Sequence, residues 1–404
     1  MKQRLIFSIV LLISLHAHSL AQGSGYCGPY NASAPIVWNG KHDTIISGLK
    51  IENPNGNCVE LSNCTNITIT NCRFGPSKGE GVTLYKCSNV NINNCSMDSI
   101  ETGVYALESQ GVNINYNDVK NVQGPSPRGQ MVQFDKVNGT GNRINWNAGE
   151  NISGQSFPED EISLYMSNGT AADSIQVIGN WIRGGGPSTS GGGIMCGDGG
   201  GSYIMVKNNS LVNPGQYGIA VSSGNNIMIT NNKIYSREYS FTNVGLYIWN
   251  QYSTSCDSIT ASGNEINWTN NQGASNGCWN AGNCGPVIWN SNTCDANIDS
   301  TILPSKIIGR CITTFTDNIK ASYDNVDIFP NPSNASFFLK IQQDLELQNT
   351  LIKIYDIYGK ELNAISISNY KTIIHGENLQ SGIYFYNVFN KNKIISKGKL
   401  IIQK

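Results

Sequence analysis

One short motif recurs along most of the chain and constrains the fold more strongly than any other feature. The motif is apolar–x–apolar–x–x–Asn/Cys–x–apolar, as in ITITNCRF at Ile67–Phe74 and VNINNCSM at Val90–Met97. It returns at Val112–Val119, Ile175–Ile182, Ile204–Leu211, Ile227–Ile234 and Ile259–Ile266. Its sixth position recurs first after 23, 23 and 22 residues and later after 23 to 33, so one structural element repeats while loops of varying length are inserted.

The motif predicts strands, because its apolar residues alternate with polar ones in steps of two and Val, Ile and Thr dominate it. A second short strand precedes it in each repeat, at residues 59–61, 82–84, 104–106, 132–134, 162–164, 194–196, 219–221 and 246–248. Several short strands in about 23 residues form one coil of a parallel β-helix. A single coil cannot bury its apolar side alone, so we expect about nine stacked coils that share a continuous core.

The Asn and Cys residues at the sixth position fall in one column when the coils are stacked. We interpret this column as structural. Inward or corner Asn side chains in stacked coils hydrogen-bond to one another and to the backbone of the turns.

Residues 1–21 have the features of a secretory signal peptide. Lys2 and Arg4 are basic, residues 5–15 are apolar, and residues 19–21 suit cleavage before Gln22. The apolar run is too short to span a membrane. We therefore expect an exported protein, in which the 12 cysteines are able to form disulfides.

The cysteines cluster at both ends of the predicted rod. Cys27 and Cys58 are expected to join at the N-terminal end. Near the C-terminal end, loops are expected to be tied by Cys256, Cys278, Cys284, Cys294 and Cys311. For the pairs one coil apart, which are Cys64 with Cys87 and Cys72 with Cys95, both bridges and stacked inward thiols remain open. Zinc is disfavoured, since no companion His or second close pair accompanies Cys278 and Cys284.

Composition changes near residue 325. Residues 22–325 carry 16 Lys or Arg against 22 Asp or Glu, a net charge of −6, whereas residues 326–404 carry 9 against 6, a net charge of +3. A mildly acidic rod argues against nucleic acid as a partner, since nucleic acid needs a basic surface. We assign residues 22–320 to the β-helix and 321–404 to a small β-sandwich, with strands at residues 336–341, 351–355, 383–388 and 394–402.

The tail resembles the C-terminal sorting domain of the type IX secretion system. The matching segments are IFPNP at Ile328–Pro332, IYDIYGK at Ile354–Lys360, LQSGIY at Leu379–Tyr384 and the terminal strand at residues 397–404. The resemblance implies a bacterium of the Bacteroidetes type, export through the periplasm and outer membrane, and the secretion machinery as a partner. It also implies that the tail is an address without a part in chemistry. We expect a monomer that is secreted or held at the cell surface.

The coils resemble the right-handed β-helix superfamily that contains pectate lyases, polygalacturonases, alginate lyases and chondroitinase-B-like enzymes. The resemblance rests on the repeat over residues 44–266, which indicates fold better than activity. It implies an acidic polysaccharide as substrate, lying along a sheet face. A polygalacturonase would need Asn-Thr-Asp, Asp-Asp, Gly-His-Gly and Arg-Ile-Lys motifs, which the sequence lacks. The predicted rod holds one histidine, His42, so acid–base chemistry by histidine is not expected.

Candidate site residues come from the outward face of the upstream strands, where the residue between two inward apolar positions points out. A predicted aromatic patch for sugar rings contains Tyr85, Tyr105, Tyr165, Tyr247 and Trp249. The predicted catalytic residues are Asp135, Lys136, Glu161, Asp198 and the loop residue Arg128. Glu159, Asp160 and Glu161 precede one strand directly and are the predicted metal ligands.

Carboxylates together with a Lys or Arg suit a β-elimination lyase. The carboxylates would hold Ca²⁺, which neutralises a uronate carboxylate, and a base then removes the adjacent ring proton. A carboxylate pair alone would suit a glycoside hydrolase instead. The main hypothesis is therefore a polysaccharide lyase, or a related enzyme, that acts on uronate-containing glycans.

The alternative is a β-helix without catalytic activity that binds glycan or contributes to the cell surface. Outward charges on a solvated sheet need no function. The two hypotheses differ in one structural respect. Convergence of Asp135, Lys136, Glu161 and Asp198 in one groove beside the tyrosines favours the enzyme, and scatter along the rod favours the alternative.

Overall fold

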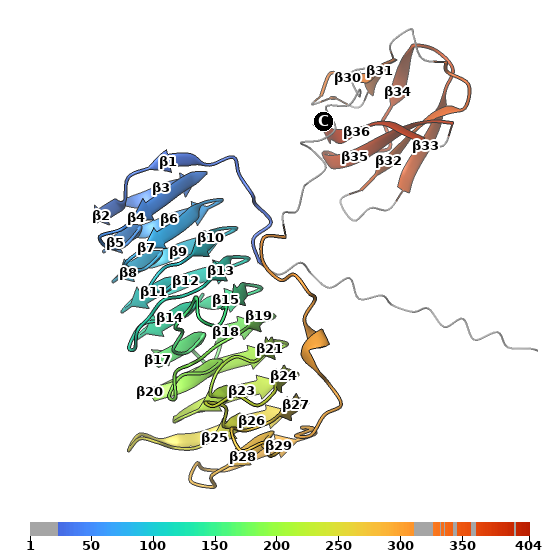
Figure 1. Ribbon diagram of the computed structural model, residues 1–404. Coiled ribbons are helices and arrows are strands. Elements are labelled where there is room, and N and C mark those ends of the chain that lie inside the picture. The colour runs from blue at the N-terminus through green and yellow to red at the C-terminus, as the bar shows by residue number, and fades with distance from the viewer. Residues whose placement is uncertain are drawn as a thin grey trace, which may run out of the picture. The chain divides into compact units, whose positions relative to one another are not determined.

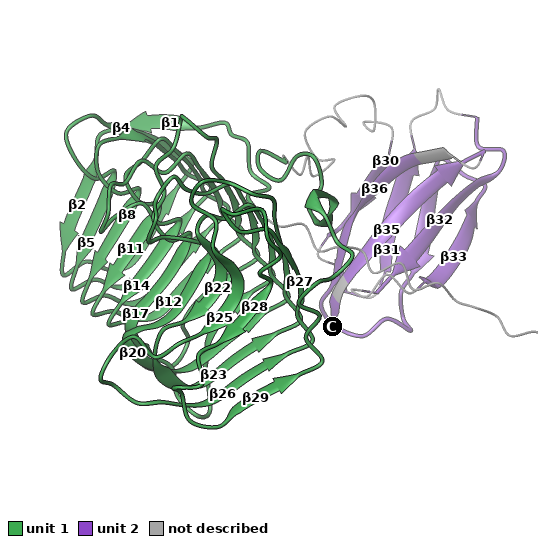
Figure 2. Ribbon diagram, turned by 60° about the horizontal axis from the view of Figure 1, so that its bottom comes forward, with its two compact units in different colours: residues 1–312 green, residues 313–404 purple. Residues whose placement is uncertain are grey.

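The computed structural model describes residues 23–310, 326–331, 333–334, 336–341, 346–356, 361–391 and 393–404. The chain forms two compact units, residues 1–312 and 313–404 (Figure 2). The predicted signal peptide and the predicted boundary between residues 320 and 321 lie outside the described residues. Within the described residues, no helix is long and apolar enough to cross a membrane.

Residues 23–310 form a parallel β-helix with three strands per coil (Figure 1). The first face is a parallel sheet of β1 (Asn31–Ser33), β4 (Leu49–Asn53), β7 (Arg73–Ser77), β10 (Ser96–Asp98), β13 (Asp118–Lys120), β16 (Ala148–Glu150), β19 (Trp181–Arg183), β21 (Ser210–Val212), β24 (Lys233–Ser236) and β27 (Glu265–Trp268).

The second face precedes the repeated motif in each coil. It contains β2 (Ile36–Asn39), β5 (Val59–Ser62), β8 (Val82–Tyr85), β11 (Val104–Leu107), β14 (Val132–Asp135), β17 (Ile162–Asn168), the start of β20 (Ile194–Lys207), β22 (Tyr217–Val221), β25 (Val244–Ile248) and β28 (Cys278–Asn280). All of these strands pair in parallel with their neighbours, for example β14 with β17.

The third face holds the start of the motif. It contains β3 (His42–Ser47), β6 (Thr65–Thr70), β9 (Ser88–Asn93), β12 (Gln110–Asn115), β15 (Arg143–Asn145), β18 (Ile175–Ile178), the end of β20, β23 (Gly224–Thr230), β26 (Cys256–Ser262) and β29 (Val287–Asn290). Within residues 23–310, nine coils are complete, from β2–β4 to β25–β27. The predicted all-β fold and its approximate number of coils are thereby confirmed.

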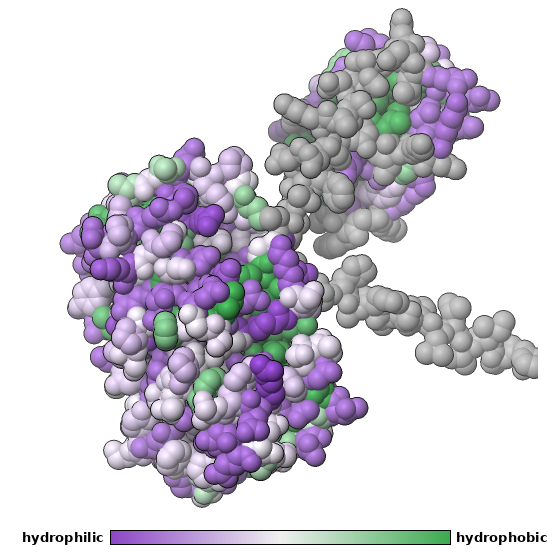
Figure 3. Space-filling model, viewed as in Figure 1, coloured by the Kyte–Doolittle hydropathy of each residue, from purple (hydrophilic) through white to green (hydrophobic). Residues whose placement is uncertain are grey.

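The interior of the rod is a column of aliphatic side chains from all three faces. The inward residues of the repeat, such as Val82, Leu84, Val90 and Ile92, are fully buried. The surface seen in Figure 3 is mostly hydrophilic, with apolar residues in small separate patches. The apolar residues of the alternating pattern therefore face the interior and the polar residues face the surface, as the two-residue period of a strand requires.

Buried thiols belong to this core. The free cysteines among the described residues are Cys58, Cys64, Cys72, Cys87, Cys95 and Cys196. The stacked pairs therefore pack as small apolar side chains and form no bridges. The predicted Cys27–Cys58 bridge is wrong, because the Cys58 thiol points inward and donates to the Ile51 carbonyl at 3.3 Å, while Cys27 belongs to a different disulfide.

Disulfides close the C-terminal coils, as the cysteine cluster predicts. Cys256 is bonded to Cys284, and Cys278 is bonded to Cys294. Cys311, the fifth member of the predicted cluster, lies outside the described residues. The two bonds tie the loops around β28 to the body of the rod.

An asparagine ladder runs inside the rod at the corner after the third face. Each side-chain amide donates to the oxygen of the next at 2.8–3.1 Å, from Asn117 through Asn147, Asn180, Asn209, Asn232 and Asn264 to Asn292. The same oxygens accept the backbone N–H of the Asn one coil earlier. The structural interpretation of this column is therefore confirmed, and the ladder fixes the register of successive coils.

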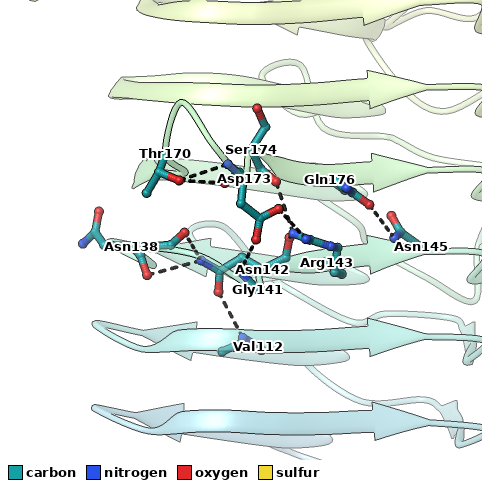
Figure 4. Close-up of polar contacts among 11 residues, drawn as sticks. Val112, Asn138, Gly141, Asn142, Arg143, Asn145, Thr170, Asp173, Ser174 and Gln176 are labelled. Carbon is teal, nitrogen blue, oxygen red and sulfur yellow. Dashed lines mark hydrogen bonds and ion pairs between the residues drawn. The ribbon is translucent and has the colours of Figure 1, made fainter.

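Longer coils carry inserted loops, and one is pinned by a charge pair (Figure 4). Asp173 pairs with Arg143 and accepts the N–H of Gly141 at 2.7 Å. Asn142 accepts the N–H of Val112, on the preceding coil, at 3.0 Å. The insertion is thus anchored to the stack and leaves the register of the strands unchanged.

The segment after β29 includes a short 3₁₀ helix, η1 (Ser300–Ile302), and runs back along the first face (Figure 1). Asp118 on β13 accepts the N–H of Gly309 at 2.7 Å and the N–H of Ser24 at 2.9 Å. Burial raises the pKa of Asp118 to about 6. The segments that precede and follow the coils therefore meet on one buried carboxyl.

The described residues of the C-terminal unit form two antiparallel sheets, as predicted for a small sandwich. One contains β30 (Val326–Phe329), β31 (Ser336–Ile341) and β34 (Lys371–His375), and the other contains β33 (Glu361–Ile367), β32 (Thr350–Tyr355), β35 (Gly382–Asn390) and β36 (Lys393–Ile402). Phe337, Ile352 and Val388 are buried between them. The four strands expected from the sequence correspond to β31, β32, β35 and β36.

We predict that Asn209→Ala destabilises the rod by about 1–3 kcal/mol, because it leaves buried ladder groups of Asn180 and Asn232 without their partner. Asn91→Ala, on the exposed side of β9, is the matched control and should change the free energy of unfolding by less than about 0.5 kcal/mol. Chemical denaturation of both variants measures the difference. Equal free energies of unfolding for the two variants would contradict a stabilising role of the ladder.

Candidate functional site

A groove of about 430 Å³ lies on the outer side of the second face, over β14, β17 and β20. Its lining consists of Ser126, Pro127, Arg128, Gln130, Gln133, Asp135, Glu159, Asp160, Ser163, Tyr165 and Asp198. Outward residues of the strands form its floor, and the loops inserted before β14 and β17 form its walls. The groove is therefore a product of the insertions, which raise walls on an otherwise flat sheet.

The strand register shows which outward side chains are neighbours. Asp135 on β14 pairs with Tyr165 on β17, and Tyr165 pairs with Asp198 on β20. An unbroken alternation would put Gly197 beside Tyr165 and Asp198 one position later. A register shift after Leu164 moves Asp198 into line, and Gly197 supplies a left-handed φ of 67° beside it. A bulge thus brings a second carboxylate into the column of Asp135.

Arg128 forms part of one wall. Its guanidinium carbon lies 3.8 Å from the centre of the Tyr105 ring. Nε is 3.4 Å from Glu80 Oε1, and Nη1 donates to Gln133 Oε1 at 3.0 Å. Because an arginine keeps its proton throughout the accessible pH range, Arg128 serves here as a fixed cation and hydrogen-bond donor.

Tyr105 fixes one oxygen of Asp135 by a hydrogen bond. The Tyr105 hydroxyl donates to Asp135 Oδ2 at 2.8 Å. Burial is the larger cause and this hydrogen bond the second, and together they raise the pKa of Tyr105 to about 12. The tyrosine therefore remains a hydrogen-bond donor. The other oxygen, Asp135 Oδ1, is buried and has no hydrogen-bond partner among the described residues. A buried acceptor in this state is costly, and a bound group that reached it would relieve the cost.

Asp160 lines the groove although it is only 8% exposed. The Tyr217 hydroxyl and the N–H of Gly192, at 3.1 Å, both donate to Oδ1, so Oδ2 is the oxygen left to meet a bound molecule. Burial raises the pKa of Asp160 to about 7, although the Tyr217 hydrogen bond acts in the opposite direction. A large fraction of this carboxyl is therefore protonated at neutral pH.

The other carboxylates of the groove are also held in place. Tyr252 donates its hydroxyl to Asp198 Oδ1. Burial raises the pKa of Asp198, and this hydrogen bond offsets part of the effect. Glu159 accepts the hydroxyl of Ser188 at 2.6 Å. The groove therefore combines four ordered carboxyl groups with Arg128, the one cationic side chain among the described residues that line it.

Two predicted catalytic residues lie outside the groove. Lys136 follows β14 in a left-handed conformation, with a φ of 53°, which turns it to a separate hollow beside Glu108 and Met166. Glu161 is fully buried, and Asn151 donates to both of its oxygens at 2.8 and 2.9 Å. Burial raises the pKa of Glu161 well above its usual range. Of the four residues whose convergence would favour the enzyme, Asp135 and Asp198 therefore share the groove, with Arg128 beside them, and Lys136 and Glu161 lie elsewhere.

The predicted metal ligands do not converge either. Glu159 faces Ser188, Asp160 faces Tyr217, and Glu161 faces inward to Asn151. The three residues lie in a bent segment before β17, not in a strand, so their side chains take separate directions. Within the described residues, no group of three or more His, Cys, Asp or Glu side chains is placed to hold a metal ion. These three residues therefore do not fit the expected Ca²⁺ site.

The predicted aromatic patch is divided among several places. Tyr165 lines the groove, and Tyr105 lies beneath Arg128. Tyr85 carries the Lys86 ammonium 4.9 Å from its ring centre. Tyr247 is buried in a small apolar cluster, and Trp249 lies near the last coils, 5.6 Å from Trp279. A single stacking surface is therefore not present over the middle coils.

Some residues of the site could not be predicted from the sequence. Tyr217 and Tyr252, which hold Asp160 and Asp198, come from later coils and bear no motif. Glu80, which pairs with Arg128, lies in the loop before β8. Gln133 does fall in the predicted outward column, and that alternation is the signal that could have found it. The others depend on how loops fold over the sheet.

Comparison with known families identifies the family to which the chain belongs. A right-handed β-helix region matches residues 34–254, more than half of the chain, and a secretion system C-terminal sorting domain matches residues 327–403. The chain therefore belongs to the right-handed β-helix family. Its C-terminal unit is a type IX sorting domain, so the protein is exported and is secreted or held at the cell surface. Both predicted resemblances are confirmed.

Solved structures with similar folds include carbohydrate-bound proteins. The catalytic domain of a GH87 α-1,3-glucanase in complex with nigerose matches with a TM-score of 0.47 and 14% identity, over 62% of this chain and 49% of that chain. A mutant tailspike protein of E. coli bacteriophage HK620 in complex with a pentasaccharide matches with a TM-score of 0.33 and 10% identity, over 65% and 57%. The chain thus spans about half the length of the glucanase domain. These values are too low to transfer an activity, and no curated protein matches the sequence.

We predict that Asp160 makes stability fall as pH rises. Its folded-state pKa of about 7 lies above the value near 3.8 of a free carboxyl, so the folded state binds the proton more tightly. The advantage is complete below about pH 4 and is lost through pH 7, for a total of roughly 4 kcal/mol. Asp160→Asn keeps both acceptor contacts and removes this dependence.

Denaturation at several pH values measures the difference. The stability of Asp160→Asn relative to the parent protein should rise between pH 4 and pH 8. A difference that stays constant over this range would contradict a raised pKa at Asp160.

Proposed function

We propose that the protein is a secreted glycoside hydrolase that cleaves a neutral polysaccharide in the groove over β14, β17 and β20. The observation that carries this proposal is the placement of a buried carboxyl, Asp160, whose pKa burial raises to about 7, in the same groove as Asp135 and Asp198. Hydrolysis of a glycosidic bond needs one carboxyl that donates a proton and a second that is ionised. The groove offers candidates for both.

Asp160 suits the role of general acid. Its pKa of about 7 keeps a large fraction of the carboxyl protonated at neutral pH and lets it release the proton readily, as a general acid must. Oδ1 is fixed by Tyr217 and Gly192, which leaves Oδ2 to deliver the proton to the glycosidic oxygen. As the bond to the leaving sugar breaks, that sugar gains the proton and positive charge develops on the other ring.

Asp135 and Asp198 are the candidates for the second carboxylate. They flank Tyr165 in one column, on the strands on either side of β17. Tyr105 and Tyr252 each donate a hydrogen bond to one of them, which fixes their orientation. Either group would stabilise the positive charge on the sugar, by direct attack or by activating a water molecule. Separate substitutions distinguish them.

The charge of the groove supports a neutral substrate. Glu159, Asp160, Asp135 and Asp198 line it together with Arg128. The carboxylates of the groove repel the carboxylates of a polyuronate chain. Such a chain would therefore bind poorly unless cations accompanied it. The hydroxyls and amides of the lining, such as Ser163 and Gln133, are suited to the hydroxyl groups of sugars.

A lyase acting on uronates remains the second candidate, and the position of Arg128 favours it. A guanidinium in the groove would neutralise the carboxylate of a uronate. Its contacts with Glu80 and Gln133 already occupy part of its donor capacity. Products of β-elimination absorb in the ultraviolet, so a panel of alginate, pectate and glycosaminoglycans tests this candidate directly.

We predict that the protein releases reducing ends from at least one neutral polysaccharide in a panel of glucans, mannans and xylans. Asp160→Asn should lower kcat by about 100-fold or more, because the proton donor is lost. In the parent protein, kcat should fall about tenfold per pH unit above pH 7, as Asp160 loses its proton. Reducing-sugar assays across pH 5–9 measure both effects.

Glu60→Gln is the matched control. Glu60 is an exposed outward carboxylate on β5, on the same face but three strands from β14 and outside the lining of the groove. Its loss should leave kcat within twofold. Full activity of Asp160→Asn, or ultraviolet-absorbing products from a uronate, would contradict the hydrolase, and binding without turnover would favour the glycan-binding alternative.

A further inference from the structure

Large aromatic side chains are exposed at the end of the second face, beyond the groove. Trp249, Tyr252 and Trp279 are 41%, 42% and 45% exposed. The ring centres of Trp249 and Trp279 lie 5.6 Å apart, with the planes tilted by 54°. Side chains of this size usually bury most of their surface, so their grouping on one face indicates a contact made with something else.

These residues lie further along the same face of the rod as the groove. Trp279 on β28 is in register with Tyr247 on β25, and the same column leads back strand by strand to Ser163 in the groove. Tyr252 connects the groove with these aromatics, since its hydroxyl donates a hydrogen bond to Asp198. From Asp198 on β20 to β28 the path crosses three strand spacings, about 14 Å. A polymer that follows the rod axis from the groove passes over the buried residues Met195, Ala220 and Tyr247 and then reaches the aromatics.

Disulfides hold this end of the face rigid. Cys256–Cys284 anchors the loop that carries Trp249 and Tyr252, and Cys278–Cys294 anchors β28 beside Trp279. Asn250 and Asn283 exchange hydrogen bonds at 2.9 and 2.8 Å. Because the rings are already fixed, little conformational entropy is lost when a ligand packs against them.

We propose that Tyr252, Trp249 and Trp279 form an aromatic track that binds sugar residues of the glycan beyond those in the groove. The inference rests on the function proposed above. One face of a pyranose ring presents C–H groups, which pack against an aromatic face without need of charge. The track therefore fits a neutral chain, and it would make long chains better ligands than short ones.

The test measures binding in the Asp160→Asn background, so that turnover does not interfere. The probes are soluble glucan, mannan and xylan polymers and their trisaccharides. Trp249→Ala and Trp279→Ala should each weaken binding of the preferred polymer about tenfold and leave trisaccharide binding within twofold. Ile288→Ala is the matched control, since Ile288 is 60% exposed on the neighbouring strand β29, on the third face.

The outcomes separate the track from the hydrolase. Polymer cleavage with kcat/KM unchanged in Trp279→Ala would overturn the track and leave the hydrolase intact. Polymer binding that Trp279→Ala weakens, without cleavage by the parent protein, would support the track and overturn the hydrolase. A dimer of the parent protein that Trp279→Ala converts to monomer in light scattering would also overturn the track, because the aromatics would then bind a second copy.

Discussion

The structure depends on the register between successive coils, and the internal asparagine ladder is the interaction that fixes it. From Asn117 to Asn264, each ladder amide is buried, donates to the next Asn and accepts from the backbone of the previous coil. A slip by one residue would turn every inward side chain outward and leave these amides unsatisfied. The ladder therefore carries no chemistry of its own, but it determines which side chains reach the surface together.

The groove follows from this constraint together with two departures from it. Regular coils would present a flat sheet whose outward residues stand in straight columns. Inserted loops raise walls on that sheet and bring Arg128 and Asp160 to its edge. A bulge in β20 then moves Asp198 into the column of Asp135 and Tyr165. The site thus lies where the repeat is interrupted, as expected if the repeat supplies rigidity and the interruptions supply specific groups.

The sequence predicted the parts of the molecule that local periodicity controls. The coils, the inward and outward columns and the sorting domain all have such a signal, and Asp135 and Tyr165 lie on the outer face, as the alternation predicts. The alternation puts Asp198 one position out of the column of these two residues, because a bulge has no mark in a period-two pattern beyond its glycine. Glu161, predicted as an outward catalytic residue, turns inward to Asn151, a contact between the residue just before β17 and the residue just after β16. The partners Tyr217 and Tyr252 depend on long-range packing, which periodicity does not encode.

The central claim is that a neutral glycan lies in the groove with Asp160 beside the bond to be cleaved. A crystal structure of Asp160→Asn with an oligosaccharide of the polymer that the parent protein degrades tests it most directly. We predict that a glycosidic oxygen lies within hydrogen-bond distance of the side chain at position 160, with the adjoining ring near Asp135 or Asp198. A sugar chain bound on another face of the rod, or one that crosses the second face without approaching position 160, would contradict the account.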